Sequence, residues 1–158
     1  MNFYLKPNSS TYKDLYITEW AWMPVRSLMA IANHIEQLET GKTLISYQLL
    51  SQMDDNAGNG IQDPDTCKKL ALRLRQLINT PEIIEDYGMT VDLIDGGFVF
   101  TYPSALCTSA MQHKHTKTIV NAMGRDKPEN LCSMLRATEE EAMQVVNFLE
   151  NCDGFLMP

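Results

Sequence analysis

The segment MTVDLIDGGFVFTY, residues 89–102, predicts a β-hairpin. Met89, Val91 and Leu93 alternate with polar residues, which is the period of a half-buried strand. Asp95-Gly96-Gly97 follows, and glycines supply the positive φ angles of a tight turn. Aromatic residues alternate on the return, at positions 98, 100 and 102. We therefore expect a small antiparallel sheet built around this hairpin.

The segments around the hairpin predict amphipathic helices. Pro24 suits the first position of a helix, because a proline there loses no needed donor, and apolar residues at helical spacing predict a helix over 24–39. Gly41 then marks its end. Asp65 is the expected N-cap of a second helix over 66–79, with an apolar inner face and a basic flank.

The last predicted helix covers 138–152. Thr138 and Glu141 have the spacing of a capping box, in which each side chain bonds the backbone of the other. Pro81 is expected to stop the second helix, and a further helix is predicted over 104–123. Short strands are expected at 3–5 and 14–20. Together, these elements predict an α+β fold in which a small antiparallel sheet packs against three or four helices.

Composition predicts one folded domain over residues 1–158. The hydrophobic fraction of 44% and the charged fraction of 21% are ordinary for a protein with a core, and no Pro/Gly/Ser-rich linker divides the chain. The formal net charge is −7. Such a chain repels nucleic-acid phosphates and anionic membranes, so neither is an expected partner. The negative charge of the chain instead favours a basic protein as its partner.

The compartment predicted from the sequence is the cytoplasm. No apolar run approaches the roughly 20 residues that span a bilayer, and the first residues lack the apolar stretch of a signal peptide. The four cysteines are widely spaced, without a CxxC pair, and are interpreted as reduced, mostly buried thiols. An exported protein with two disulfides is the alternative.

The stretch SQMDDNAGNGIQDP, residues 51–64, resembles a ligand loop most closely. If Gly60 is placed at position 6 of a calcium loop, Ala57 and Thr66 fall where oxygen ligands are needed. A phosphate loop is also disfavoured, since Lys68 follows Gly60 by eight residues, with carboxylates between. A turn that leads into a helix is the preferred interpretation. A contact role for Asp54, Asp55 and Asn59 stays open.

Histidines and cysteines offer a second candidate site. His113 and His115, with Cys107 and Cys132, could supply zinc ligands, but their spacing matches no standard module. A basic exposed patch is the preferred alternative. The sequence has no GxSxG, HExxH or GxGxxG motif, and no catalytic residue, metal or cofactor is predicted.

Two features predict a protein-binding surface. Five carboxylates and no Lys or Arg lie between Glu82 and Tyr102, and Asp86, Asp92 and Asp95 belong to this set. A core edge is the preferred place for Trp20 and Trp22, and the alternative is an interface, where tryptophan is enriched and Trp22 is the candidate anchor.

Three motifs together resemble a loose family of small uncharacterised phage and bacterial proteins. The motifs are Trp20-x-Trp22-x-Pro24, the segment Asn56-x-Gly58-Asn59-Gly60-Ile61 before a basic helix, and the ending Asn147-Phe148-Leu149-Glu150-Asn151-Cys152-Asp153-Gly154-Phe155. Asp153 stands where the family pattern has a second glycine. The resemblance covers about a third of the chain. It implies a compact domain and no known activity, so it assigns no functional residue.

The function that we expect is a non-enzymatic, cytoplasmic protein-binding domain. One specific form is an immunity or antitoxin-like inhibitor that masks a basic partner, for example a toxin, with its carboxylates. A small metal-dependent or hydrolytic enzyme centred on His113, His115 and Cys107 is one alternative. A phage-type structural protein that self-assembles is another. The oligomeric state is not predicted.

Overall fold

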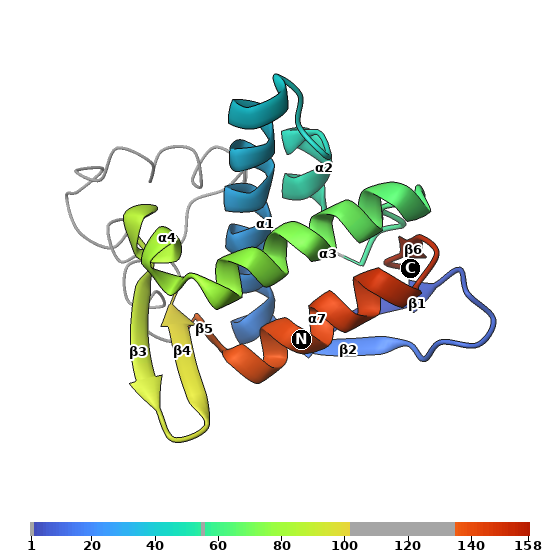
Figure 1. Cartoon of the computed structure of the whole chain (residues 1–158). Helices are drawn as coiled ribbons and strands as arrows, with labels where there is room; N and C mark the ends of the chain where they lie inside the picture. The colour runs from blue at the N-terminus through green and yellow to red at the C-terminus, as the bar shows by residue number, and fades with distance from the viewer. Residues whose placement is uncertain (1, 55, 102–134) are drawn as a thin grey trace.

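The computed structural model describes residues 2–54, 56–101 and 135–158. In this part of the chain the fold is α+β, as predicted, with five helices and two three-stranded antiparallel sheets (Figure 1). The first sheet has the order β2-β1-β6, from Leu15–Thr18, Asn2–Pro7 and Phe155–Leu156. The second has the order β3-β4-β5, from Thr90–Ile94, Gly97–Thr101 and Arg136–Thr138.

The short N-terminal strands therefore do not join the hairpin in one sheet. β2 runs directly into the first helix at Thr18, which fixes one end of its pair with β1. The second edge of β1 is occupied by β6, whose Leu156 lies opposite Lys6. β1 thus has a neighbour on each edge, and the hairpin forms a separate sheet with β5.

Helix α1, Glu19–Thr40, begins five residues earlier than predicted. The hydroxyl of Thr18 accepts a hydrogen bond from the N–H of Ala21, and so satisfies a donor that would otherwise be free. Pro24 lies inside the helix, not at its first position. Because proline has no N–H, the carbonyl of Trp20 lacks its usual helical hydrogen bond in the second turn. Gly41 ends the helix at φ 82°, as predicted.

Helix α3, Pro64–Asn79, has Asp63 as its N-cap, so the assignment of Asp65 is wrong. The Asp63 carboxylate accepts from the N–H of Thr66 at 3.1 Å, and Pro64 takes the first helical position. Pro81 follows the end of α3 and also starts the short helix α4, Pro81–Asp86. A short helix α2, Tyr47–Gln52, precedes the loop at 53–63.

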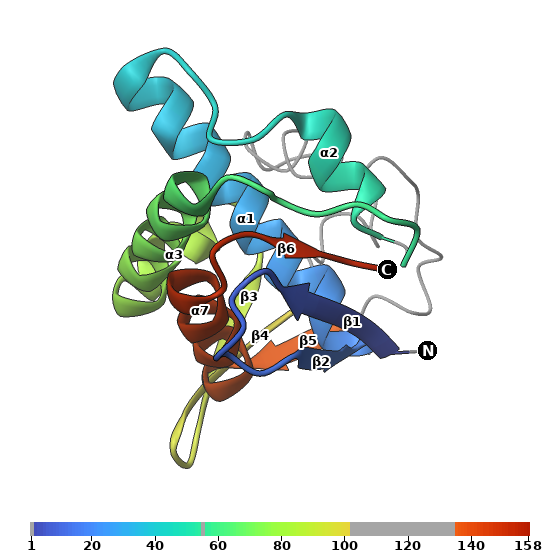
Figure 2. The same cartoon turned by 90° about the vertical axis from the view of Figure 1, so that its right-hand side faces the viewer.

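Helix α7, Glu139–Asn151, has the predicted capping box. The Thr138 hydroxyl accepts from the N–H of Glu141, and the Glu141 carboxylate accepts from the N–H of Thr138, each at 3.0 Å. In Figures 1 and 2, α7 and α3 lie side by side and cross α1. The ion pair of Arg75 with Glu150 joins α3 to α7 at 2.5 Å.

The core lies between these three helices and the two sheets. Thirteen consecutive residues of α1, from 21 to 33, are buried, including the polar side chains of Arg26 and Asn33. Asn33 accepts the N–H groups of Leu44 and Ile45 and so fixes the loop after α1. Arg26 donates to the carbonyls of Leu50 and Ser51 near the end of α2. These hydrogen bonds offset the cost of burying polar groups.

Candidate protein-binding surface

The β3–β4 hairpin extends away from the helices (Figure 1). Its inner face is anchored by Phe98 and Phe100, which are buried, and Phe100 lies opposite the buried Ala137 of β5. Cross-strand partners in an antiparallel pair point to the same face of the sheet. The base of the hairpin is therefore fixed in the core, and its tip is presented to solvent.

The tip of the hairpin exposes two apolar side chains. Leu93 is 89% exposed and Ile94 is 47% exposed. Leu93 lies opposite the buried Phe98 and so shares the core-facing side of the hairpin, yet little of the body covers it. Ile94 points to the other side, because successive strand residues alternate. Single exposed apolar side chains are ordinary on protein surfaces, but here two neighbouring ones stand together at the tip of the hairpin.

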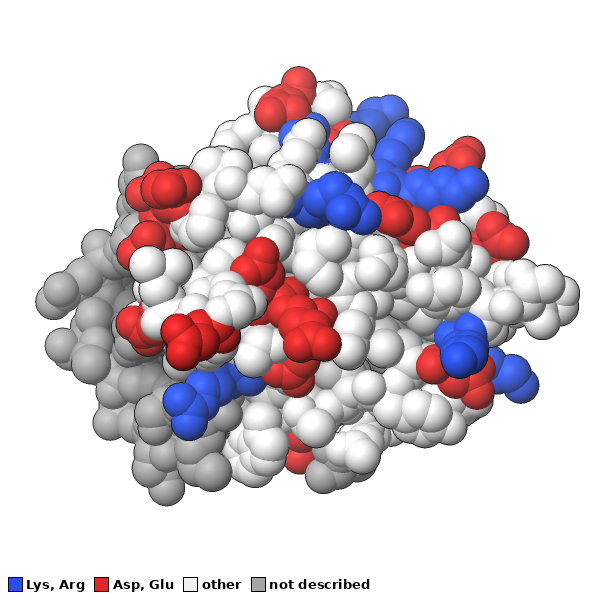
Figure 3. Space-filling view, turned by 60° about the horizontal axis from the view of Figure 1, so that its bottom comes forward, with Lys and Arg blue, Asp and Glu red and all other residues white. Residues whose placement is uncertain are grey.

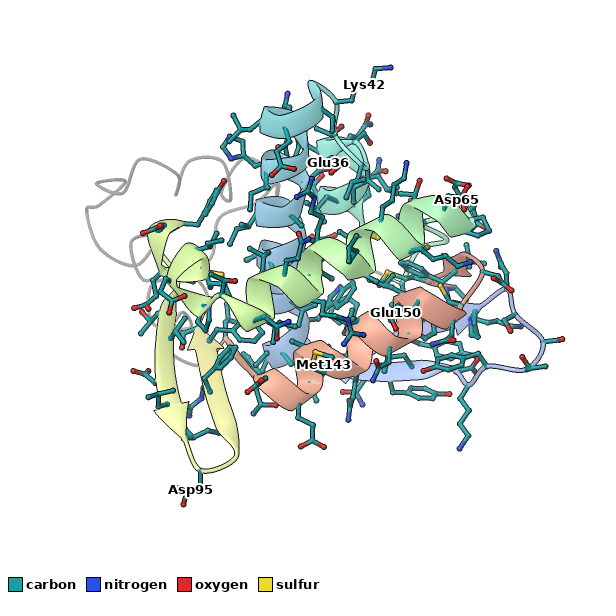
Figure 4. The ribbon with its side chains drawn as sticks, viewed as in Figure 1. Glu36, Lys42, Asp65, Asp95, Met143 and Glu150 are labelled. Atoms are coloured by element: carbon teal, nitrogen blue, oxygen red, sulfur yellow. The ribbon has the colours of Figure 1, made fainter. Side chains whose placement is uncertain are left out.

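Carboxylates lie near the tip, and Asp92 shares the face of the hairpin to which Ile94 points. Asp92 lies opposite Val99, which in turn lies opposite Thr138, so Asp92 and the start of α7 share one face. The Glu139 side chain lies directly against Gly97, the first residue of β4. Figure 4 places Asp95 at the far end of the hairpin. Figure 3 shows acidic side chains gathered on the face of the molecule that carries the hairpin, next to a basic group.

We name Asp92, Leu93, Ile94, Asp95 and Glu139 the hairpin surface. Asp86, also predicted to bind a partner, is exposed at the end of α4, four residues before β3. The nearest basic side chain along the sheet is Arg136, which lies opposite Thr101 at the end of β4 away from the turn. The tip itself therefore carries carboxylates without a cation in its own strands.

The other predicted contact residues are not part of the hairpin surface. Asp54, Asp55 and Asn59 belong to the loop between α2 and α3, which lies at a different end of the molecule from the hairpin (Figures 1 and 2). Asp54 is half-buried, and Asp55 lies outside the described residues. Trp22 is only 1% exposed, and its indole N–H donates to the carbonyl of Met53 at 2.7 Å. The prediction of Trp22 as a surface anchor is therefore wrong. Trp20, which is 42% exposed, is the tryptophan at the surface.

The glycine-rich loop is part of the fold. Its residues 58–62 bind the chain end at 154–157, and we name these two segments the clasp. Gly58 donates to the carbonyl of Met157 at 2.7 Å, and Met157 donates to Asn59 at 2.6 Å. A β-carbon at Gly60 would collide with the carbonyl oxygen of Phe155. The carbonyl of Asn59 accepts from Met157, and its side chain donates to the carbonyl of Gln52. The turn interpretation of this loop therefore fits the structure better than a contact role.

The clasp also places the resemblance motifs together. The middle motif and the last motif meet at Gly60 and Phe155, and the Trp22 indole binds Met53 just before the middle motif. Asn56 contributes by accepting from the N–H of Tyr4 and donating to the carbonyl of Asn2. These residue types are therefore needed for packing and turn geometry at this end of the fold.

The zinc hypothesis falls on residues outside the described part of the chain, namely Cys107, His113, His115 and Cys132. Within the described residues, no group of three His, Cys, Asp or Glu side chains could hold a metal ion. His34 lies on α1, and its Nδ1 is 2.6 Å from the hydroxyl of Tyr87. Burial raises the pKa of Tyr87 to about 12, so this hydroxyl stays protonated near neutral pH. The contact ties α1 to the end of α4.

A hollow of about 410 Å³ lies between the loop before β2 and the outer face of α7. Its lining includes Tyr12, Asp14, Asn147 and Phe148. Asp14 accepts from the Tyr4 hydroxyl at 2.6 Å, and this bond raises the pKa of Tyr4 to about 12. The hydroxyl of Tyr4 is therefore protonated near neutral pH.

No family model matches the chain, and neither do any curated proteins or solved structures. In the described part of the chain, none of the helices has both the length and the apolar character needed to cross a membrane. The candidate surface also contains Leu93, Ile94 and Glu139, which the sequence did not single out. In the sequence, Leu93 fits the alternating pattern of a strand and Glu139 fits the start of a helix. Each was therefore interpreted as part of an element of structure.

Proposed function

We propose that this chain is a non-enzymatic protein-binding domain of the cytoplasm, and that it holds a basic partner at the hairpin surface. The observation that carries the proposal is the 89% exposure of Leu93 next to Asp92 and Asp95. Burying one such leucine fully against a partner contributes about 1.5–3 kcal/mol. The surrounding carboxylates favour a partner with Lys or Arg around an apolar pocket.

Charge and apolar area have different roles in this proposal. The net charge of −7 and the carboxylates of the hairpin surface attract a cationic protein and speed its association. Leu93 and Ile94 then slow its dissociation, because they lose water-exposed apolar area. They point to opposite sides of the strand, so the partner has to enclose the tip. Masking of a toxin or nuclease site by an immunity-like inhibitor is one form of this function.

The proposal is tested with matched variants of the immobilised protein. Leu93→Ser is compared with Leu72→Ser, since Leu72 is also exposed but lies on α3. Asp95→Lys is compared with Asp65→Lys, and Figure 4 places these two aspartates on opposite ends of the molecule. Proteins captured from a lysate of the source cells are identified with each variant, at low and at high salt.

We expect a basic protein that binds the native chain, Leu72→Ser and Asp65→Lys, but is lost with Leu93→Ser and Asp95→Lys. Its capture falls as salt rises, because screening weakens attraction between exposed charges. Circular dichroism checks that the variants are folded. The proposal fails if every captured protein binds the hairpin variants and their controls equally.

A further inference from the structure

Helix α3 carries an exposed apolar side chain with cations beside it. Leu72 is 57% exposed, whereas most large apolar side chains of the described residues are covered. Lys68 and Lys69 lie four and three residues before it, so the three side chains share one side of the helix. We name Lys68, Lys69 and Leu72 the α3 face.

The positive charge of this face comes from its two lysines. Both are exposed, and in the described part of the chain neither lies within ion-pair distance of a carboxylate. The arginines that follow on α3 differ, because both already form ion pairs with glutamates of neighbouring helices. Asp65, three residues before Lys68, bounds the face at the start of the helix.

The α3 face and the hairpin surface are complementary in charge and in apolar content. The hairpin surface has exposed apolar side chains next to the exposed Asp92 and Asp95, and the α3 face has Leu72 next to two lysines. Contact between the two would cover leucine with leucine and bring carboxylates to ammonium groups. One copy cannot make this contact within itself, because Asp65 and Asp95 mark opposite ends of the molecule (Figure 4).

We propose that the chain forms a symmetric dimer, in which the hairpin surface of each copy docks on the α3 face of the other. Figure 3 shows carboxylates and, on another part of the same face of the molecule, basic side chains. When two copies present such a face to each other about a two-fold axis, each contact is made twice. The net charge of −7 opposes the approach of two copies. The dimer is therefore reversible and depends on these local contacts.

The dimer covers the surface that the proposed function assigns to a basic partner. A second copy and a basic partner therefore compete for the hairpin surface, and dimerisation lowers the fraction of chains that are open to that partner. The inference rests on the hairpin surface of the proposed function, but it needs no foreign protein. The purified full chain is thus sufficient to test it.

Analytical ultracentrifugation measures the mass of the purified chain over a wide range of concentration. We expect the mass of the native chain to rise from that of one copy to that of two. Leu72→Ser removes the apolar centre of both contacts at once, so it should weaken dimerisation by about a hundredfold. Leu38→Ser is the matched control, because Leu38 is 69% exposed but lies on α1, and it should dimerise like the native chain.

Two charge variants test the pairing of the surfaces. Asp92→Lys/Asp95→Lys makes the hairpin surface positive, and Lys68→Asp/Lys69→Asp makes the α3 face negative, so each variant alone should stay monomeric. Their equimolar mixture should form a 1:1 dimer, because both contacts then join opposite charges, and high salt should dissociate it. Lys42→Asp is the control, since Lys42 is exposed after the end of α1, and it should dimerise like the native chain. Circular dichroism checks that every variant is folded.

The inference is overturned if the native chain is monomeric at every concentration, if its dimer is unaffected by Leu72→Ser, or if the mixed charge variants stay monomeric. A monomeric native chain leaves the proposed function intact, because the hairpin surface then remains open to a basic partner. Failure to capture any basic protein from a lysate would in turn leave the dimer intact. The two ideas can therefore fail separately.

Discussion

Replacing Trp22 by phenylalanine tests whether this side chain stabilises the core or serves as a surface anchor. Trp22 is 1% exposed, and its indole N–H is bonded to the Met53 carbonyl at 2.7 Å in a buried site. Phenylalanine keeps an aromatic ring but has no donor. The carbonyl of Met53 then loses its partner away from water, which costs about 1–3 kcal/mol.

The smaller ring adds a second loss. Trp22 packs against Phe3, with ring centroids 6.0 Å apart, and the missing part of the indole leaves a void in the core. Complete truncation of a buried aromatic costs about 3–5 kcal/mol, which sets an upper limit for this change. We therefore expect the free energy of unfolding to fall by about 2–4 kcal/mol for Trp22→Phe.

Urea unfolding followed by far-ultraviolet circular dichroism measures this loss, since fluorescence changes with the tryptophan itself. A slope near 2 kcal/mol per molar urea predicts a midpoint lower by about 1–2 M. The matched control is Trp20→Phe, because Trp20 is 42% exposed two residues earlier and should change stability by less than about 0.5 kcal/mol. Equal midpoints for the two variants would refute the burial argument.

Two further predictions concern the loop and the helix caps. Gly60→Ala should destabilise the fold more than Gly58→Ala in urea unfolding, because a β-carbon at Gly60 meets the Phe155 carbonyl, whereas a β-carbon at Gly58 meets open space and only strains φ 86°. Asp63→Asn should destabilise at pH 7 but have little effect near pH 2. Hydrogen bonds from Thr66 lower the folded pKa of Asp63, so its contribution is present above the unfolded pKa of about 3.9 and is lost as pH falls through the lower folded value. An unchanged difference at both pH values would contradict this.

The elements set by neighbouring residues could be predicted from the sequence. The hairpin depends on alternation and on the glycines of its turn, and both are local. The capping box of Thr138 and Glu141 depends on a spacing of three residues. Gly41 ends α1 through its own positive φ. In each case the interaction that stabilises the element joins residues close in the chain, so periodicity and capping rules suffice.

The rest depends on contacts between distant residues. Thr18 and Pro24 both carry helix-start signals, and Asp63 competes with Asp65, so choosing between them requires the position of the whole helix. Nothing near Trp22 indicates that its indole binds Met53, 31 residues away. The exposure of Leu93 depends on where the body of the molecule ends. The candidate surface could therefore be predicted for its aspartates, but not for its apolar centre.

The central place of β1 has a consequence for how the chain folds as it is synthesised. β1 is made first, yet one of its two neighbours, β6, is made about 150 residues later. Bringing such distant segments together is entropically slow. On the ribosome, the nascent chain can form α1 and the hairpin early, whereas its first sheet stays incomplete until Phe155 and Leu156 emerge. Completion of this sheet therefore comes after synthesis of every other described element.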